Sequence, residues 1–406
     1  VGYSILYWFR FTYAIVDDEL RIEKGLLIRK KRYISKNRIQ SIDLTQGIIH
    51  RILGLTKVQI ETAGSDSDVD ASLSAVTFVE GELIRDTLKS NRKIDTNTTD
   101  FELTDEVKEE KAEKDEPTYE VSFKRLIIAG STSGRLGVIL GLAVAFFSEI
   151  ENLIPDRIYD QAFEWVVALT VQIIIALAIL VLLVLWMLGT LGTVIKYGNF
   201  KITRFEKELF ITRGLLEKKQ MTIPLKRIQA VGMKQSLVRQ PLGFATIYVE
   251  IAGGETKEGT DMETLLVPII HKKEVDAFFE KMLPELKKIP TELTPLPKRA
   301  LPYYLLRVAF LPLIALIVVG FVWPEWMFIP AIISLIALLF GYACYKTTGF
   351  SFAEDQLTIC TRNFSKDTLI AKRSRIQAMT KKRHFIHRKQ KLETLRLSIL
   401  NNFMGR

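Results

Sequence analysis

Cysteine is scarce in this chain, and its scarcity removes one class of scaffold. The two cysteines are Cys344, in an apolar run, and Cys360, in a predicted strand. Two cysteines in such different settings form no paired disulfide framework. This usage favours reducing surroundings for the soluble parts of the chain.

Histidine is scarce as well, with four residues. His384 and His387 stand three apart, but no third ligand of Cys, Asp or Glu type lies nearby at metal-ligand spacing. Glycine-rich phosphate loops and a serine in a G-x-S-x-G setting are also missing. We therefore predict no catalytic residues, no metal site and no cofactor, and expect a protein that is not an enzyme.

Basic residues and long apolar runs are what the chain does have. The net charge is +10, and 48% of the residues are hydrophobic but gather in a few long runs. The excess of positive charge predicts an anionic partner. For a chain with membrane spans, that partner is the lipid bilayer with its anionic phospholipid head groups, and not a nucleic acid.

Four apolar runs approach or exceed the roughly 20 residues that cross a bilayer as a helix. Residues 162–194 are the clearest, and residues 305–322 and 326–345 are separated by a three-residue turn. Residues 126–147 are interrupted by Ser131, Thr132, Ser133 and Arg135, so they read as an interfacial stretch followed by a short span or as the first helix of a hairpin. We predict two transmembrane hairpins, each with its tip outside and its ends in the cytoplasm, because basic residues flank the ends and acidic residues cluster between the helices of the first.

The soluble segments repeat. Residues 13–64 align with residues 202–253 without a gap at an offset of 189, so that Arg38 matches Arg227. A third copy starts near residue 350, with Arg375 offset by 148 from Arg227. Alternation of apolar and polar residues predicts strands in each copy, with Gly25 and Gly214 at a positive φ in a turn and Asn363 taking that role in the third copy. A short strand and a helix follow in the first two copies, so each copy predicts a small PH-like barrel or sandwich.

The repeats and runs divide the chain into eight predicted parts. These are the end of a truncated transmembrane helix (1–11), PH-like domain 1 (12–92), an acidic disordered linker (93–122), a transmembrane hairpin (123–197), PH-like domain 2 (198–286), a Pro-rich connector (287–302), a second transmembrane hairpin (303–346) and a divergent, incomplete PH-like domain 3 (347–406). The predicted fold class is an α+β membrane protein in which helical hairpins alternate with three small PH-like β-barrel domains.

The repeated pattern resembles the bacterial PH-like membrane-flanked domain family (bPH2). The residues that carry the resemblance are Leu20, Ile22, Gly25, Arg38, Ile39, Gln40, Leu53, Gly54, Ala63 and Gly64, with their second-copy equivalents Leu209, Ile211, Gly214, Arg227, Ile228, Gln229, Leu242, Gly243, Ala252 and Gly253. The layout is similar to that of YdbT-type multi-pass members, which carry three such domains and have a YdbS-type neighbour with one. The resemblance implies a PH-like barrel at the inner membrane face, and no reaction. The third copy departs from the pattern, with Gln390-Lys391 in place of the Leu-Gly pair.

Two sets of residues are candidates for binding. The first is the repeated Arg-x-Gln motif, which could hold a phosphate or carboxylate or could instead satisfy backbone groups: Arg38, Gln40, Arg227, Gln229, Arg375 and Gln377. The second is a basic stretch in the third copy, which could bind anionic lipid or an acidic partner or could be a solvated face: Lys372, Arg373, Arg375, Lys381, Lys382, Arg383, Arg388, Lys389 and Lys391.

We expect a non-enzymatic membrane protein whose cytoplasmic PH-like domains bind proteins or the inner leaflet. Exposed strand edges would mediate a homo-oligomer or a complex with a YdbS-like membrane partner. A role in envelope stress or in resistance to membrane-active compounds is a further hypothesis. The alternative is a component of a membrane export or lipid-handling machine.

Overall fold

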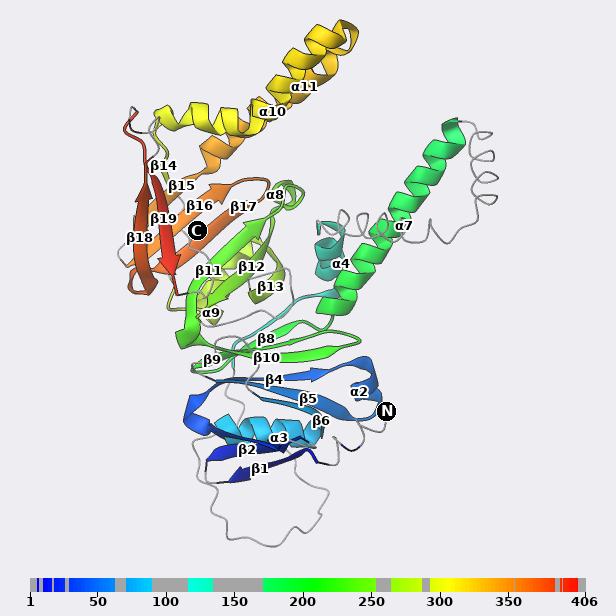
Figure 1. The fold of residues 1–406 in the computed structure, drawn as a ribbon, viewed down its shortest axis with the longest axis vertical. Coiled ribbons are helices and arrows are strands. Elements are labelled where there is room, and N and C mark those ends of the chain that lie inside the picture. The colour runs from blue at the N-terminus through cyan, green and yellow to red at the C-terminus, as the bar shows by residue number, and fades with distance from the viewer. Residues whose placement is uncertain are drawn as a thin grey trace. The chain divides into compact units, whose positions relative to one another are not determined.

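The computed structural model describes residues 6, 10–16, 18–25, 29–62, 71–89, 116–133, 171–252, 264–286, 293–353, 355–383, 388 and 390–400 (Figure 1). Two compact units divide the chain. Unit 1 comprises Val1–Glu120 and Ile195–Lys226, and unit 2 comprises Val121–Val194 and Arg227–Arg406. The boundary after Lys226 cuts the second repeat in two, so the repeats of the sequence are not the compact units of the fold.

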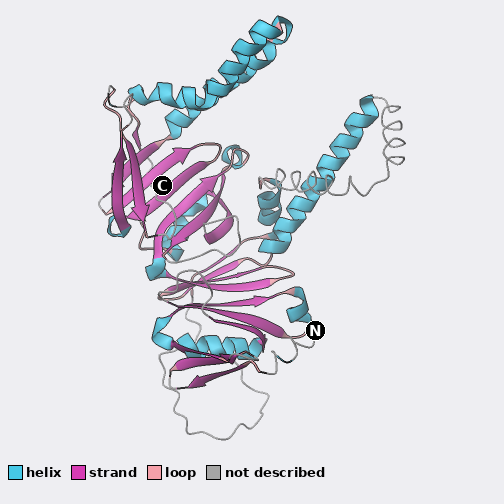
Figure 2. Ribbon diagram, in the orientation of Figure 1, coloured by secondary structure: helices cyan, strands magenta, loops and turns pink. Residues whose placement is uncertain are grey.

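Unit 1 holds two antiparallel sheets (Figure 2). The smaller has the order β1-β2-β3 and contains the first half of repeat 1. The larger has the order β6-β5-β4-β10-β9-β8-β7, so the second half of repeat 1 continues into the first half of repeat 2. The strands of unit 1 are β1 (Thr12–Val16), β2 (Glu19–Lys24), β3 (Lys30–Ser35), β4 (Ile39–Gln46), β5 (Leu55–Thr62), β6 (Ala71–Thr77), β7 (Thr118–Glu120), β8 (Lys201–Arg204), β9 (Glu208–Arg213) and β10 (Lys218–Pro224).

The core of repeat 1 lies between its two halves. Leu20 and Ile34 from the small sheet cluster with Ile42 and Val58 from the large one. Helix α3 (Phe78–Lys89) adds Ile84 and Leu88 from one face to the same cluster. Alternate residues of each strand enter this core, which is the arrangement that period-two patterning predicts. Short helix α2 (Ile48–Ile52) connects β4 to β5.

Unit 2 is built in the same way as unit 1, from the half-domains that follow in sequence. Its large sheet has the order β13-β12-β11-β17-β16-β15-β14, which joins the second half of repeat 2 to the first half of repeat 3. The second half of repeat 3 is a separate two-stranded sheet, β18-β19. The strands are β11 (Ile228–Gln235), β12 (Phe244–Ile251), β13 (Thr264–His271), β14 (Thr294–Pro295), β15 (Gly349–Ala353), β16 (Gln356–Arg362), β17 (Lys366–Lys372), β18 (Ile376–Lys382) and β19 (Thr394–Ile399). The helices of this sheet region are α8 (Arg239–Leu242) and α9 (Val275–Met282).

The predicted β-barrel in each repeat is therefore not what the described residues form. In all three repeats a three-residue 3₁₀ turn separates the third strand from the fourth: η1 (Lys36–Arg38), η2 (Leu225–Arg227) and η6 (Arg373–Arg375). The third and fourth strands then belong to different sheets, so no sheet closes on itself among the described residues. Each repeat is a pair of half-domains. The second half-domain of one repeat and the first half-domain of the next repeat together form one large sheet.

Within the part of the chain that the structure describes, three helices are long and apolar enough to cross a membrane: Ile175–Tyr197, Lys298–Val322 and Pro324–Thr347. The last two form the predicted second hairpin, because α10 (Leu301–Val322) and α11 (Phe328–Thr347) lie side by side and are joined by η5 (Pro324–Trp326) (Figure 1). A Cβ at Gly341 would come within 3.0 Å of the carbonyl oxygen of Tyr304, so the two helices approach closely at this small residue.

The first helix of the predicted first hairpin lies only partly within the described residues. Of the two predicted helices, α7 (Val171–Tyr197) is present, but α4 (Phe123–Ser131) has nine residues and ends at Thr132. Buried Arg239 donates to the carbonyl oxygen of Ala129 and to Oγ1 of Thr132, at 2.9 and 2.8 Å, and so occupies the C-terminal end of α4. Nine helical residues span about 14 Å, which is too short to cross a bilayer. The remainder of the predicted span, residues 134–147, lies outside the described residues, as does most of the acidic linker.

The turn glycines behave as predicted in two copies. Gly25 has φ 117° and Gly214 has φ 105°. The expectation for Asn363 is wrong, because Asn363 is not among the described residues with positive φ. Lys391 instead has φ 54°, at the position where the first two repeats place Gly54 (φ 68°) and Gly243 (φ 70°). The third repeat therefore keeps the left-handed backbone of the Leu-Gly pair although it has lost the glycine.

Candidate interaction site

The two internal junctions, where one repeat pairs with the next, follow one register. At the first junction Lys218 of β10 lies opposite Gln46 of β4. At the second, Lys366 of β17 lies opposite Gln235 of β11. Since Gln235 is Gln46 shifted by 189 and Lys366 is Lys218 shifted by 148, the pairing is the same interaction made twice. Half-domain pairing is thus a built-in property of the repeat.

The first junction contains a carboxyl group in an unusual setting. Half-buried Asp43 on β4 accepts a hydrogen bond from the backbone N–H of Thr222 on β10, at 3.2 Å. Burial, followed by the repulsion of Glu61, raises the pKa of Asp43 to about 7. The Thr222 N–H and the nearby Lys219 and Lys89 oppose this shift. The charge on the first junction therefore changes near neutral pH.

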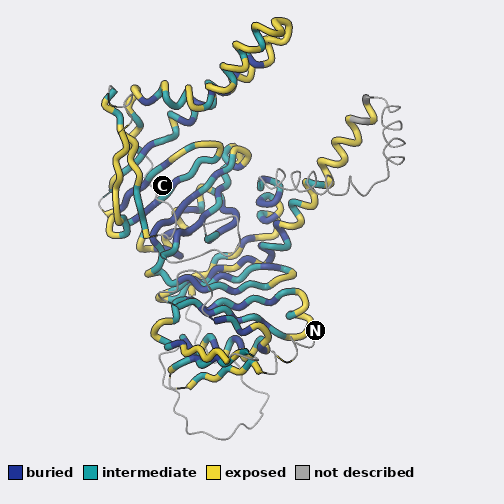
Figure 3. The backbone as a smooth tube through the Cα atoms, viewed as in Figure 1, coloured by how far each residue is buried: buried dark blue, intermediate teal, exposed yellow. Residues whose placement is uncertain are grey.

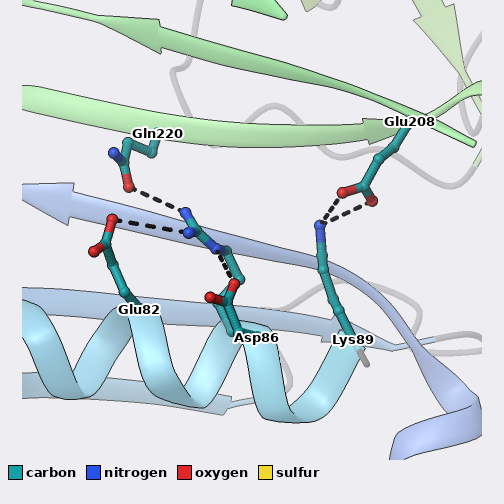
Figure 4. A network of polar contacts seen from close by, with 6 residues as sticks. Glu82, Asp86, Lys89, Glu208 and Gln220 are labelled. Atoms are coloured by element: carbon teal, nitrogen blue, oxygen red, sulfur yellow. Dashed lines mark hydrogen bonds and ion pairs between the residues drawn. The ribbon is translucent and has the colours of Figure 1, made fainter. Parts of the chain in front are cut away.

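Side chains from helix α3 reach across the first junction to strands of repeat 2 (Figure 4). Lys89 donates to both carboxylate oxygens of Glu208 at 2.9 Å, and Arg85 donates to Gln220 at 3.4 Å. Arg85 also pairs with Glu82 and Asp86 on its own helix. Burial lowers the pKa of Lys89, so Glu208 is the group that keeps this amine charged. Hydrogen bonds between charged groups contribute about 1.5–3 kcal/mol, which makes α3 a tie between the two repeats.

The second junction uses a different set of side chains. The Tyr248 hydroxyl, on buried β12, donates to Asp367 of β17 at 2.8 Å. The ring of Tyr248 passes over Gly232 of β11, where a Cβ would lie 1.9 Å from the ring. Lys234 and Asp367 face each other across the strands, which is a favourable cross-strand pair. Gly232 occupies the position in repeat 2 that Asp43 occupies in repeat 1. The two junctions therefore differ here: Asp43 accepts a backbone N–H, whereas Gly232 leaves room for the Tyr248 ring.

The two terminal half-domains have strand edges without a partner among the described residues. Strand β3 is the third strand of its repeat, and the third strands of the other repeats, β10 and β17, are paired at the equivalent edge. Strand β18 is the fourth strand of its repeat, and the other fourth strands, β4 and β11, are paired at the equivalent edge. The side chains on β18 are mostly exposed, as are those at the start of β3 (Figure 3). Met379 on β18 is 48% exposed, whereas its equivalents Ile42 and Val231 are 1% and 0% exposed. We call these two strands the free edges.

The Arg-x-Gln motif makes backbone contacts in the second repeat. Nε and Nη2 of Arg227 donate to the carbonyl oxygen of Ala252 at 3.0 and 2.8 Å. Gln229 donates to the carbonyl oxygen of Arg227 at 3.0 Å. These contacts hold the start of β11 to the end of β12 and favour the structural role of the motif. Arg38 and Arg375 end the turns η1 and η6, and Gln40 and Gln377 are the second residues of β4 and β18. An anion-binding role for any of the six stays a prediction.

The basic residues of the third repeat do not form one face. Lys381 and Lys382 are neighbours on β18, so their side chains point to opposite faces. Lys372, at the end of β17, pairs with Glu285 at 2.7 Å, and Arg383 pairs with Glu393. Arg373 and Arg375 lie on η6, Arg388 and Lys391 lie between β18 and β19, and Lys389 lies outside the described residues. The set is dispersed and partly neutralised, and its role in lipid or partner binding stays a prediction.

Sequence reasoning missed the junctions and the free edges. Two signals could have pointed to them. Asp43 is an acidic residue within a strongly alternating strand pattern, and residues 29–32 are a run of four basic residues that leads into β3. Basic residues at a strand edge are a common defence against unwanted pairing.

Apolar spanning helices together with repeated β-rich half-domains define a membrane protein built from PH-like repeats. The sequence profile described as "Bacterial PH domain" matches residues 1–92, 161–286 and 300–401, and the chain belongs to this family. A curated relative, the UPF0699 transmembrane protein YdbT of Bacillus subtilis (strain 168), is 35% identical over 406 residues, which covers 98% of this chain and 81% of the relative. No solved structure matches the chain.

Proposed function

We propose that this membrane protein is an assembly scaffold, whose PH-like half-domains lie on the cytoplasmic face and bind partner proteins by strand pairing. The observation that carries the proposal is the repeated register of the two internal junctions. Two pairs of half-domains within this chain associate in the same register. A half-domain of this kind has the geometry to pair in the same way with a half-domain of another chain. Strand addition to a sheet edge is an established mode of protein recognition.

The cytoplasmic placement is proposed from the charges beside the spans. Lys298 and Arg299 precede α10 and Lys346 lies in the last turn of α11, whereas the tip between the two helices carries Glu325. Positive residues at the ends of a hairpin favour their retention in the cytoplasm. Those basic residues of repeat 3 that reach the anionic inner leaflet would each contribute about 1 kcal/mol to membrane attachment.

The proposed partners are membrane proteins with PH-like half-domains of their own, such as a YdbS-like neighbour. A partner held in the same bilayer is confined to the same thin layer as the scaffold. Confinement raises its effective concentration, so even a modest strand-pairing affinity suffices for assembly.

The proposal is tested by purifying the tagged full-length protein from its native membranes in a mild detergent. Quantitative mass spectrometry should find a partner protein in stoichiometric amount, and an unrelated multi-pass protein with the same tag serves as the control. Recovery of the chain without any stoichiometric partner would contradict the scaffold.

Sidedness is tested separately by labelling a cysteine placed at exposed Lys273, because the native Cys344 and Cys360 are buried. A membrane-impermeant maleimide should react with Lys273→Cys in inside-out vesicles only. Labelling in right-side-out vesicles would place the half-domains on the opposite side of the membrane.

A further inference from the structure

The outer edge of β3 has the form of a docking edge. Its equivalents β10 and β17 are both covered by the fourth strand of the preceding repeat. Tyr33 of β3 is 57% exposed, whereas its equivalents Thr222 and Ile370 are 3% and 0% exposed. The backbone at this edge is directed outward as well. Because the N–H of Thr222 points to β4, the N–H of Tyr33, at the same place in the repeat, points to the free edge.

A second copy of this chain would bring β18 to that edge, since β18 is the fourth strand of the last repeat. The register of the two internal junctions then places Lys382 opposite Lys30 and Lys381 opposite Lys31. Arg383 falls opposite Arg29 in the same register. Like-charged residues meet at these three positions, and the pair of Lys30 with Lys382 opposes the association most, because Glu23 pairs with Lys31 at 2.7 Å and Glu393 pairs with Arg383.

The internal junctions contain no such conflict. At the position of Lys30, the first junction has Lys219 opposite uncharged Thr45, and the second has Asp367 opposite Lys234. In both internal junctions, a lysine at this position lies opposite a neutral or acidic side chain. A strand that fits β3 must do the same.

We propose that the β3 edge docks the fourth strand of a PH-like half-domain in a different protein, one that carries acidic or uncharged polar side chains opposite Lys30 and Lys31. The like charges on β3 and β18 exclude a second copy of this chain. This inference rests on the proposed function and names the edge, the register and the chemistry of the partner.

The charge rule is tested in the full-length protein without knowledge of the partner. Lys381→Glu with Lys382→Glu turns two of the opposed pairs into attractive ones, and should strengthen self-association at least about tenfold, the factor that corresponds to 1.4 kcal/mol. The wild type should remain unassociated in detergent by light scattering over the same concentrations. Lys272→Glu with Lys273→Glu is the matched control, since these exposed lysines carry the same charge change away from both edges.

Reversal of the charge on the other edge supplies the second arm. Adding Lys30→Glu to the Lys381→Glu, Lys382→Glu variant should weaken the new association, because the carboxylates introduced at positions 30 and 382 then oppose each other. Circular dichroism and thermal melts confirm that each variant is folded. A folded Lys381→Glu, Lys382→Glu variant with no gain in association overturns the proposal, as does an association that Lys30→Glu does not weaken.

Register is tested by oxidation in the same Lys381→Glu, Lys382→Glu background. Tyr33→Cys with Met379→Cys should form an intermolecular disulfide, because directly opposed residues of antiparallel strands have Cα atoms about 4.5–5.5 Å apart, within disulfide range. Tyr33→Cys with Thr380→Cys should not, since a one-residue slip turns the side chain to the other face. Equal yields from the two pairs overturn the predicted register.

The natural partner is tested with the tagged full-length protein in native membranes. Tyr33→Pro removes the outward N–H but no hydrogen bond to β2, whereas Tyr33→Ala removes the ring and keeps the N–H. The partner should be lost with Tyr33→Pro and kept with Tyr33→Ala. A partner that stays bound to Tyr33→Pro overturns the β3 assignment and leaves the scaffold function intact, whereas a wild type without any partner contradicts the scaffold itself.

Discussion

Replacing Asp43 by Asn should stabilise the first junction at alkaline pH and leave it unchanged at acidic pH. Asp43 lies on β4 and accepts the backbone N–H of Thr222. Asn keeps a side-chain oxygen in the same place, so the hydrogen bond survives the substitution. What the substitution removes is a carboxylate that is half-buried and repelled by Glu61.

The size of the effect follows from the pKa shift. The pKa of Asp43 is raised from 3.8 to about 7 by burial and by Glu61. At about 1.36 kcal/mol per pKa unit, this shift corresponds to a ceiling of about 4 kcal/mol. Because the side chain retains some contact with water, screening reduces the expected gain to about 1–2 kcal/mol.

The sign also follows from the direction of the shift. Between pH 4 and 7 the folded chain binds a proton at Asp43 that the unfolded chain has released. The stability of the wild-type junction therefore falls as pH rises from about 4 to about 7, and is level above that. The Asp43→Asn variant lacks this slope, so the two proteins should agree at pH 4 and diverge by pH 8.

Hydrogen exchange of the β10 amides is the assay, with rates corrected for the intrinsic dependence of exchange on pH. Protection of the Thr222 amide at pH 8 should rise about 5- to 30-fold in Asp43→Asn, the factor that corresponds to 1–2 kcal/mol. Amides of β12, in unit 2, serve as the internal reference. Equal protection of both proteins at pH 8, or a wild-type junction that gains stability as pH rises to 7, would refute the reasoning.

Three further predictions concern single side chains. Arg239→Met should lower the free energy of unfolding by about 3 kcal/mol, because Ala129 and Thr132 at the end of α4 lose a buried charged donor. Proteolysis of residues 123–133 should then show that α4 is released. Arg239→Lys should restore part of the lost stability. Lys391→Gly should raise the thermal midpoint, with a gain of about 1 kcal/mol from relief of the left-handed backbone, and an unchanged midpoint would contradict that strain. Gly232→Ala should displace the Tyr248 ring and destabilise the second junction by about 1–3 kcal/mol, seen as faster exchange of the β17 amides.

Much of the local structure was predictable. The turn glycines Gly25 and Gly214 and the α10–α11 hairpin follow from patterns within a few tens of residues, and the offset of 189 follows from the comparison of two segments of about fifty residues. In the second repeat, Arg227 makes the kind of backbone contact that is one of the two interpretations of the Arg-x-Gln motif. Periodicity, turn chemistry and apolar length are local properties, so a single sequence carries them.

The candidate site was not predictable in the same way. Each repeat was expected to close on itself, because its strands are consecutive in sequence and consecutive strands usually pair. The exchange at the third and fourth strands depends on a three-residue 3₁₀ turn whose sequences, such as Leu225-Lys226-Arg227, carry no signal for leaving the sheet. The basic residues of repeat 3 looked like one patch because they are close in sequence, but strand geometry sends Lys381 and Lys382 to opposite faces.

Sequence patterns alone predict the apolar helices α7, α10 and α11, the three repeats, the alternation that makes their strands and the run of charge at residues 29–32. Only the tertiary structure decided which strands pair, because hydrogen bonding between sheet edges is made by backbone groups that are the same in every residue. That pairing gives Asp43 and Gly232 equivalent places in the two closed junctions, and it places Tyr33 on a third-strand edge that both junctions cover in the other repeats. The basic run 29–32 is important for the proposed partner binding because it lies at the outer edge of β3, and the equivalent edge is covered in the other two repeats.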